Sequence, residues 1–262
     1  MGLGLDYPTA WGRGYLARAA RDLLHRYALA PYARYLSTLE VHGSENLEGP
    51  GPFIFVANHV SHVDTILVLT ALPDRLRRRT VVAAAMDSFF MSRSTAFRTV
   101  LAFNAIPVDR LKVNRRSAQL ALELVEDGWN LLIYPEGGRS PDGRLQEFKG
   151  GAAYLAERSR TSVIPTYIHE SGWLKGPRYA KAPLYTEAPS QGRHHVVVTF
   201  GEPLRCGEDE NMRRFGSRIE DAVARLGRAV SGDPDYGVTR VGPSEPDDGA
   251  SDGADEPGVP EA

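Results

Sequence analysis

The chain contains one cysteine, Cys206, among its 262 residues. A single cysteine excludes an intrachain disulfide, and the paired cysteine spacing typical of zinc sites is absent. The N-terminus lacks a basic segment followed by an apolar core, so no secretory signal peptide is predicted. No uncharged apolar run approaches the roughly 20 residues that a bilayer-spanning helix needs. We therefore expect a protein of a reducing compartment, the cytoplasm, that does not cross a membrane by itself.

The formal net charge of −2 conceals an uneven distribution of charge. From Ser231 to the end there are nine acidic residues and one basic residue, Arg240, a local charge of −8, which leaves +6 for the rest. Gly, Pro, Asp, Glu and Ser dominate this acidic stretch, which predicts a disordered tail over 231–262. The basic body suits anionic partners such as lipid headgroups or phosphorylated substrates. Nucleic acid is an improbable partner, because the arginines do not alternate with aromatic residues on a strand.

The N-terminal segment 1–43 is predicted to be helical. Residues 14–39 alternate apolar and basic side chains at helical spacing, and Pro31 is expected to break them into two amphipathic helices. Basic amphipathic helices that carry aromatic residues are typical of anchors at a membrane surface. The alternative is a pair of helices packed on the domain with a solvated arginine face.

Residues 44–230 alternate strand and helix patterns without internal repeats. This alternation predicts an α/β domain with a mixed, largely parallel sheet flanked by helices. The strands are expected at residues 53–57, 80–85, 105–108, 130–134, 162–168 and 195–200. The helices are expected at residues 64–72, 95–103, 114–127, 150–158 and 208–230.

The segment 58–64, with sequence NHVSHVD, lies where a buried strand gives way to a helix. Neutral histidine can take a proton from a hydroxyl, and a carboxylate beside it can fix its tautomer. His59 and Asp64 are therefore candidate catalytic residues. A structural interpretation is also open, in which Ser61 is the N-cap of the helix and Asp64 completes a capping box.

Three further segments carry polar residues at strand ends. The segment 134–140, YPEGGRS, follows a buried strand, and its glycines let the backbone turn tightly. Arg139 there, and Arg110 after the strand at 105–108, present guanidinium groups suited to phosphate or carboxylate. Pro165 interrupts the strand at 162–168, which predicts an edge strand or a bulge.

In order and spacing these four segments resemble the four sequence blocks of the glycerophosphate and lysophosphatidate acyltransferase superfamily, the PlsC-like family. The resemblance covers about residues 53–203, and the FKGG sequence at 148–151 resembles the segment that follows the third block. Gly138 stands where the family usually has threonine.

The resemblance implies a glycerol-3-phosphate acyltransferase-like fold and acyl transfer from acyl-CoA or acyl carrier protein, without a cofactor or metal. The implied acceptor is 1-acyl-glycerol-3-phosphate, giving phosphatidate, or else another lysophospholipid or glycerol 3-phosphate, reached from the membrane surface. His59 would be the general base and Asp64 would orient it, while Glu136 would bond an acceptor hydroxyl or position Arg139. The residues expected to bind substrate are Arg110, Glu136, Gly137, Arg139, Ser140 and Lys149. Asn58 and Ser61 would cap the helix or orient the histidine.

Two other classes of protein remain open on the residues alone. A metal hydrolase would use His59, His62 and Asp64 as ligands. A lipid-binding protein without catalytic activity is the alternative outside the enzymes.

Overall fold

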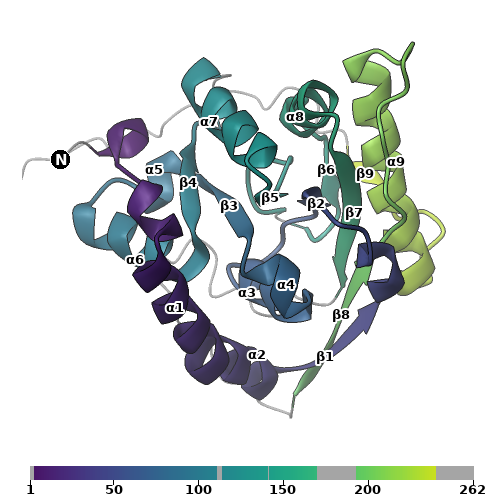
Figure 1. The fold of residues 1–262 in the computed structure, drawn as a ribbon. Helices are drawn as coiled ribbons and strands as arrows, with labels where there is room; N and C mark the ends of the chain where they lie inside the picture. Colours follow the sequence, from purple (N-terminus) through teal and green to yellow (C-terminus); the bar gives the residue numbers. More distant parts are fainter. Residues whose placement is uncertain (1–2, 111–113, 141, 170–192, 240–262) are drawn as a thin grey trace, which may run out of the picture.

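The computed structural model describes residues 3–110, 114–140, 142–169 and 193–239 (Figure 1). These residues form a seven-stranded sheet in the order β1-β8-β7-β2-β5-β3-β4. Every neighbouring pair in it is parallel except β7 and β8, so β1 and β8 run opposite to the other strands. The strands are β1 (Ser37–His42), β2 (Phe53–Ala57), β3 (Thr80–Ala85), β4 (Ala105–Val108), β5 (Asn130–Ile133), β7 (Ser162–His169) and β8 (His194–Phe200). The predicted α/β class and mixed, largely parallel sheet are confirmed.

Helices cover both faces of this sheet (Figure 1). The longer helices are α1 (Tyr15–Leu24), α2 (Ala30–Leu36), α3 (Asp64–Ala71), α6 (Arg93–Phe103), α7 (Arg115–Glu126), α8 (Gly151–Ser159) and α9 (Met212–Ser231). The short elements are η1 (Gly4–Asp6), η2 (Ala10–Arg13), the π-helix η3 (His25–Leu29), η4 (Ser44–Leu47), α4 (Asp74–Arg77) and α5 (Met86–Phe89), with β6 (Leu145–Gln146) and β9 (Val238–Thr239) in a second, two-stranded sheet.

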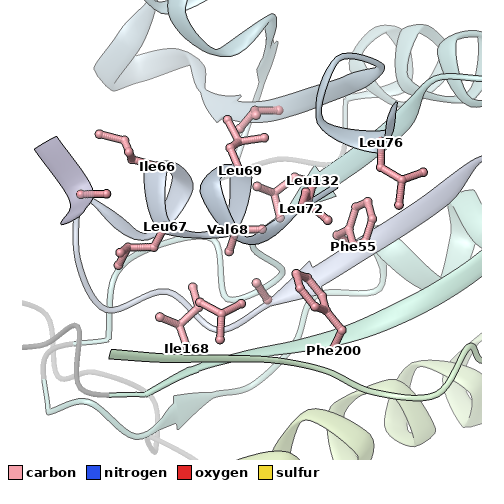
Figure 2. Close-up of a cluster of buried hydrophobic side chains, with 14 of the residues drawn as sticks. Phe55, Ile66, Leu67, Val68, Leu69, Leu72, Leu76, Leu132, Ile168 and Phe200 are labelled. Atoms are coloured by element: carbon pink, nitrogen blue, oxygen red, sulfur yellow. The ribbon is translucent and has the colours of Figure 1, made fainter. Parts of the chain in front are cut away.

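The side chains of each strand point alternately to the two faces of the sheet, so the core has two layers, one on each face. Phe55 and its same-face neighbours pack under α2, α3 and α4, whereas Ile54 and Val56 point to α7, α8 and α9. Figure 2 shows the first layer, in which α3 side chains lie over Phe55, Ile168 and Phe200. Side chains at successive positions of a strand point to opposite faces, so a five-residue strand buried throughout supplies both layers.

The N-terminal segment differs from its prediction in two respects. Pro31 does not break the helix, because it falls in the first turn of α2, directly after the π-helix η3, where its missing N–H costs little. The helix ends at Leu36, and Leu39 lies on strand β1, which pairs with β8 along residues 37–42. The predicted N-terminal segment 1–43 therefore contains β1, which is a strand of the main sheet. Within the described residues, none of the helices combines the length and hydropathy that a bilayer crossing requires.

Strand β7, which carries Pro165, is internal and lies between β2 and β8, so the expectation of an edge strand is wrong. Val163 bridges Leu204 and Thr166 pairs with Phe200, so residues 164–165 face residues 201–203. Two residues of β7 thus face three residues of the opposite segment, as in a β-bulge. Such an irregularity accommodates Pro165, which has no N–H. The bulge alternative is the one that the structure bears out.

The C-terminal stretch is also more ordered than its composition predicts. Residues 232–239 belong to the described structure, β9 pairs with β6, and Tyr236 is buried. The rest of the predicted acidic tail, 240–262, lies outside the described residues.

Candidate active site

The carboxyl ends of β2, β5, β3 and β4 lie at one edge of the sheet, because these strands are parallel. The sequence that follows each of them supplies the candidate site. Ligands bind at this edge in open α/β sheets, where loops are exposed but held by a rigid scaffold.

His59 and Asp64 are in direct contact. Nδ1 of His59 lies 2.9 Å from Oδ2 of Asp64, and the side chains are 20% and 0% exposed respectively. The same carboxylate oxygen accepts the backbone N–H groups of Val60 and Ser61 at 2.7 and 2.8 Å. A carboxylate held in this way fixes the tautomer in which Nδ1 carries the proton, so Nε2 is left with a lone pair. The pair therefore has the arrangement of a general base and its orienting acid.

Ser61 and Asn58 were predicted to cap the helix or to orient the histidine, and neither of them is the N-cap. Helix α3 begins at Asp64 with Val63 as N-cap, and the Ser61 hydroxyl accepts the Val63 N–H, at 3.4 Å. The half of the capping box that does form is the bond from the Ser61 N–H to the Asp64 carboxylate. Asn58 instead bonds both backbone groups of Ile168, at 2.7 and 3.0 Å, and so joins the end of β2 to β7.

Tyr134 is a site residue that the sequence reasoning missed. Its ring stacks on the His59 ring with centroids 4.2 Å apart and an interplanar angle of 25°. Its hydroxyl lies 3.0 Å from Oγ1 of Thr65, and burial raises the pKa of the phenol, so it stays neutral. The stack orients the imidazole. It also places the electron-rich face of the Tyr134 ring against any positive charge that develops on the imidazole. An aromatic residue at the end of a buried strand was the available signal.

Glu136 holds the backbone of the histidine loop. Its Oε1 accepts the His59 N–H at 2.7 Å, and its Oε2 accepts the Gln146 N–H at 3.0 Å. Burial raises the pKa of Glu136 to about 8, although both N–H groups lower it. Each oxygen thus already accepts one backbone N–H. These bonds give Glu136 a role in holding the loop, and its predicted contact with an acceptor hydroxyl or with Arg139 stays a prediction.

Ser140 complements this contact from the other side of His59. Its N–H donates to the His59 carbonyl at 2.7 Å, while its hydroxyl lies 2.9 Å from Oδ1 of Asp142 and accepts the Gly143 N–H at 2.9 Å. Ser140 is buried, so the structure gives it a positioning role instead of a place among groups open to a ligand.

Arg110, Lys149 and Gly137 lie together beside this loop. The Arg110 guanidinium pairs with Asp87 at 2.7 Å, and its Nη1 reaches the Gly137 carbonyl at 3.5 Å. Lys149 donates to the Arg110 carbonyl at 2.5 Å. Gly137 has φ +74°, which favours glycine, and a Cβ there would lie 2.5 Å from Nζ of Lys149, so the lysine packs directly over this turn. Asp87, on α5, was not foreseen as a partner of Arg110.

Arg139 is exposed on the same turn. The next residue, Ser140, bonds the His59 carbonyl, so Arg139 lies beside the histidine loop. Partial burial, and after it the positive charge of Arg139, lower the pKa of His62. Gly138 beside Arg139 has open space around its Cα. Among the described residues no group of three or more His, Cys, Asp and Glu side chains is placed to hold a metal, and His59, His62 and Asp64 do not form one.

Comparison with known proteins shows what the chain resembles. The family model described as Acyltransferase matches residues 38–169. The chain is 28% identical over 139 residues to 1-acyl-sn-glycerol-3-phosphate acyltransferase alpha of Mus musculus, covering 51% of this chain and 47% of that protein. It is 26% identical over 200 residues to the Bos taurus protein of the same name, covering 74% and 64%. The chain thus spans roughly half to two thirds of these curated relatives.

A solved structure has the same fold. It is that of the 1-acyl-sn-glycerophosphate (LPA) acyltransferase, PlsC, from Thermotoga maritima, with a TM-score of 0.62 and 21% sequence identity. The match covers 87% of this chain and 86% of that chain. At this identity the similarity establishes the α/β fold alone.

Proposed function

The chain belongs to the Acyltransferase family, and on that premise we propose that it moves a fatty acyl group from a thioester to a hydroxyl of 1-acyl-glycerol-3-phosphate, giving phosphatidate. Acyl-CoA or acyl carrier protein would be the donor, and another lysophospholipid or glycerol 3-phosphate is the alternative acceptor. The observation that carries this proposal is the His59–Asp64 pair, in which Nδ1 of His59 is bonded to the carboxylate and Nε2 is the nitrogen left to take a proton. The relatives that match the chain bear the name of this activity.

The proposed reaction needs no nucleophile from the protein. As the acceptor oxygen bonds to the thioester carbonyl carbon, its proton passes to Nε2 of His59. Asp64 and the face of Tyr134 stabilise the imidazolium that forms. Collapse of the tetrahedral intermediate breaks the carbon–sulfur bond, and the imidazolium returns its proton to the departing thiolate.

The acceptor phosphate is assigned to the basic side chains beside the histidine. Arg139 is exposed on the turn that holds His59, and Arg110 and Lys149 lie next to Gly137 of the same turn. Guanidinium groups match phosphate oxygens in geometry and charge. Arg110 already forms an ion pair with Asp87, so Arg139 is the stronger candidate of the two arginines for binding the phosphate.

The test of the activity is an acyl-transfer assay read by lipid mass spectrometry. Purified full-length protein is offered acyl-CoA or acylated carrier protein together with a panel of lysophospholipids and glycerol 3-phosphate. Formation of phosphatidate from 1-acyl-glycerol-3-phosphate is the expected result. Failure to acylate any member of the panel with either donor contradicts the proposal.

Replacing Arg139 by alanine is expected to raise the acceptor KM by about ten- to a hundredfold, because a charged hydrogen bond is worth roughly 1.5–3 kcal/mol. The donor KM should change little. Arg158→Ala is the matched control, since Arg158 is also exposed but lies in the last turn of α8. An unchanged acceptor KM, or a defect limited to the donor, would refute the assignment.

We further propose that the continuous helical segment α1, η3 and α2 brings the protein to the cytoplasmic surface of an anionic membrane. Tyr15 and Leu16 are 82% and 81% exposed, and Leu23 and Tyr27 are also exposed large apolar residues. Leu16, Leu23 and Tyr27 recur at helical spacing and so share one face. Exposed arginines on these helices would add about 1 kcal/mol each near an anionic surface.

The triple variant Leu16→Ser, Leu23→Ser, Tyr27→Ser is expected to lose flotation with phosphatidylglycerol-containing vesicles, while wild-type binding weakens as salt rises. These side chains are exposed, so the fold should survive the substitutions. Tyr154→Ser, at an exposed position of α8, is the control. Flotation of the triple variant equal to wild type, or wild-type binding that ignores both salt and lipid charge, would show that the helices are a packing element only.

A further inference from the structure

Tyr236 anchors the stretch that follows α9. Its side chain is 7% exposed and packs with Leu145 and Val223, and its ring meets Tyr167 edge-on with centroids 5.4 Å apart. Gly227 of α9 lies beneath the ring, where a Cβ would come within 2.3 Å of it. The helix therefore leaves a gap that the tyrosine fills, which is a specific packing arrangement for a segment of polar composition.

Residues 233–239, which we call the strap, are fastened to residues 143–146. Strand β9 pairs in parallel with β6, with Leu145 opposite Val238 and Gln146 opposite Thr239. The Tyr236 hydroxyl donates to the Gly143 carbonyl at 3.4 Å. Arg144 pairs with Asp233 at 3.8 Å and donates to the Asp235 carbonyl at 3.4 Å. These polar contacts to residues 143–146 are long, so β-pairing and the buried ring hold the strap there. The Arg228 guanidinium donates to the Tyr236 carbonyl at 2.9 Å and ties the strap to α9.

The segment 143–146 in turn holds the backbone of His59 by two routes. The Gln146 N–H donates to Glu136, whose other oxygen accepts the His59 N–H. The Gly143 N–H donates to the Ser140 hydroxyl, and the Ser140 N–H donates to the His59 carbonyl. Both backbone groups of the histidine therefore depend on residues that the strap fastens.

We propose that the strap, with Tyr236 at its centre, positions the catalytic loop through β6, Glu136 and Ser140. Within the described residues Tyr236 contacts Leu145, Tyr167 and Gly143 and does not contact His59, so it is a positioning residue that acts through others. The inference rests on the proposed acyl transfer, in which Nε2 of His59 must meet the acceptor hydroxyl at hydrogen-bond distance. A displacement of about 1 Å in such a group can cost roughly a hundredfold in rate. Loosening the strap should thus lower kcat and leave substrate affinity nearly intact.

Two truncations of the full chain test the proposal. One ends after Gly232, the C-cap of α9, and so keeps that helix whole while removing the strap. The other ends after Thr239 and keeps the strap. The expected result is a kcat within about twofold of wild type for the longer chain and a loss of about ten- to a hundredfold for the shorter one. The acceptor KM should stay within about threefold in both.

Point variants keep the test decisive if the shorter chain unfolds. Tyr236→Phe retains the buried ring and should restore at least half of the wild-type kcat, whereas Tyr236→Ala should reproduce the loss. Melting curves identify the variants that remain folded. A folded Tyr236→Ala or shortened chain with wild-type kcat overturns the proposal, as does a defect expressed in KM alone. A wild-type protein without any transfer activity would instead be a failure of the proposed function.

Discussion

Substitution of His59 by alanine is expected to lower the rate of acyl transfer by about 10²–10⁴-fold, the range that general-base help contributes. The ring is partly exposed, its Nδ1 is committed to Asp64, and its Nε2 is the nitrogen left for the acceptor hydroxyl. The Val60 and Ser61 N–H groups still hold the Asp64 carboxylate in this variant, so the loss should fall on kcat while the melting temperature stays within a few degrees of wild type. Steady-state rates with the acceptor identified by the panel assay measure the effect.

His62→Ala is the matched control for this experiment. His62 is the other histidine of the loop, is exposed, and is not bonded to Asp64. Its removal should change the rate by no more than a few fold. Turnover of the His59→Ala protein within tenfold of wild type, with a native melting curve, would refute the general-base assignment.

The strands of the sheet were predictable because hydrophobic runs and turn residues mark them locally. The prediction for 53–57 matches β2 at both ends, and the one for 105–108 matches β4. Strand β1 was missed, because its apolar and polar residues continue the amphipathic pattern of α2 and only pairing with β8 decides its conformation. The internal position of Pro165 was missed for a similar reason, since a bulge depends on the partner strand.

Contacts between distant residues account for what the sequence left open in the site. The pairing of His59 with Asp64 could be inferred because five residues span one strand-to-helix junction. The hydrogen bond between the His59 N–H and Glu136 joins residues 77 positions apart in the sequence, and no local sequence pattern predicts it. Tyr236 is a stronger example, because a sequence rich in Asp, Pro and Gly predicts disorder, whereas a gap over Gly227 of α9 gives its ring a buried position.

Replacement of Asp64 by asparagine is expected to reduce kcat by about 10²–10⁴-fold, comparable to the loss of the base itself. One oxygen of the amide can still accept the Val60 and Ser61 N–H groups, so the turn before α3 should keep its shape. The same amide oxygen can still accept the Nδ1–H of His59, but the negative charge that stabilises the imidazolium is lost. The rate should therefore fall even where the backbone is unchanged.

The stability of this variant separates catalysis from structure. Oδ1 of Asp64 is buried and has no hydrogen-bond partner within the described residues, so an amide NH₂ placed there would lack an acceptor. Its burial should cost about 1–3 kcal/mol of unfolding free energy, measured by denaturant titration. Ser61→Ala controls for the turn, because it removes the weak 3.4 Å bond to the Val63 N–H and leaves the backbone bonds to Asp64 in place. If Asp64→Asn lost stability but kept its turnover, Asp64 would be a structural residue of the α3 N-terminus, and His59 would act without an orienting acid.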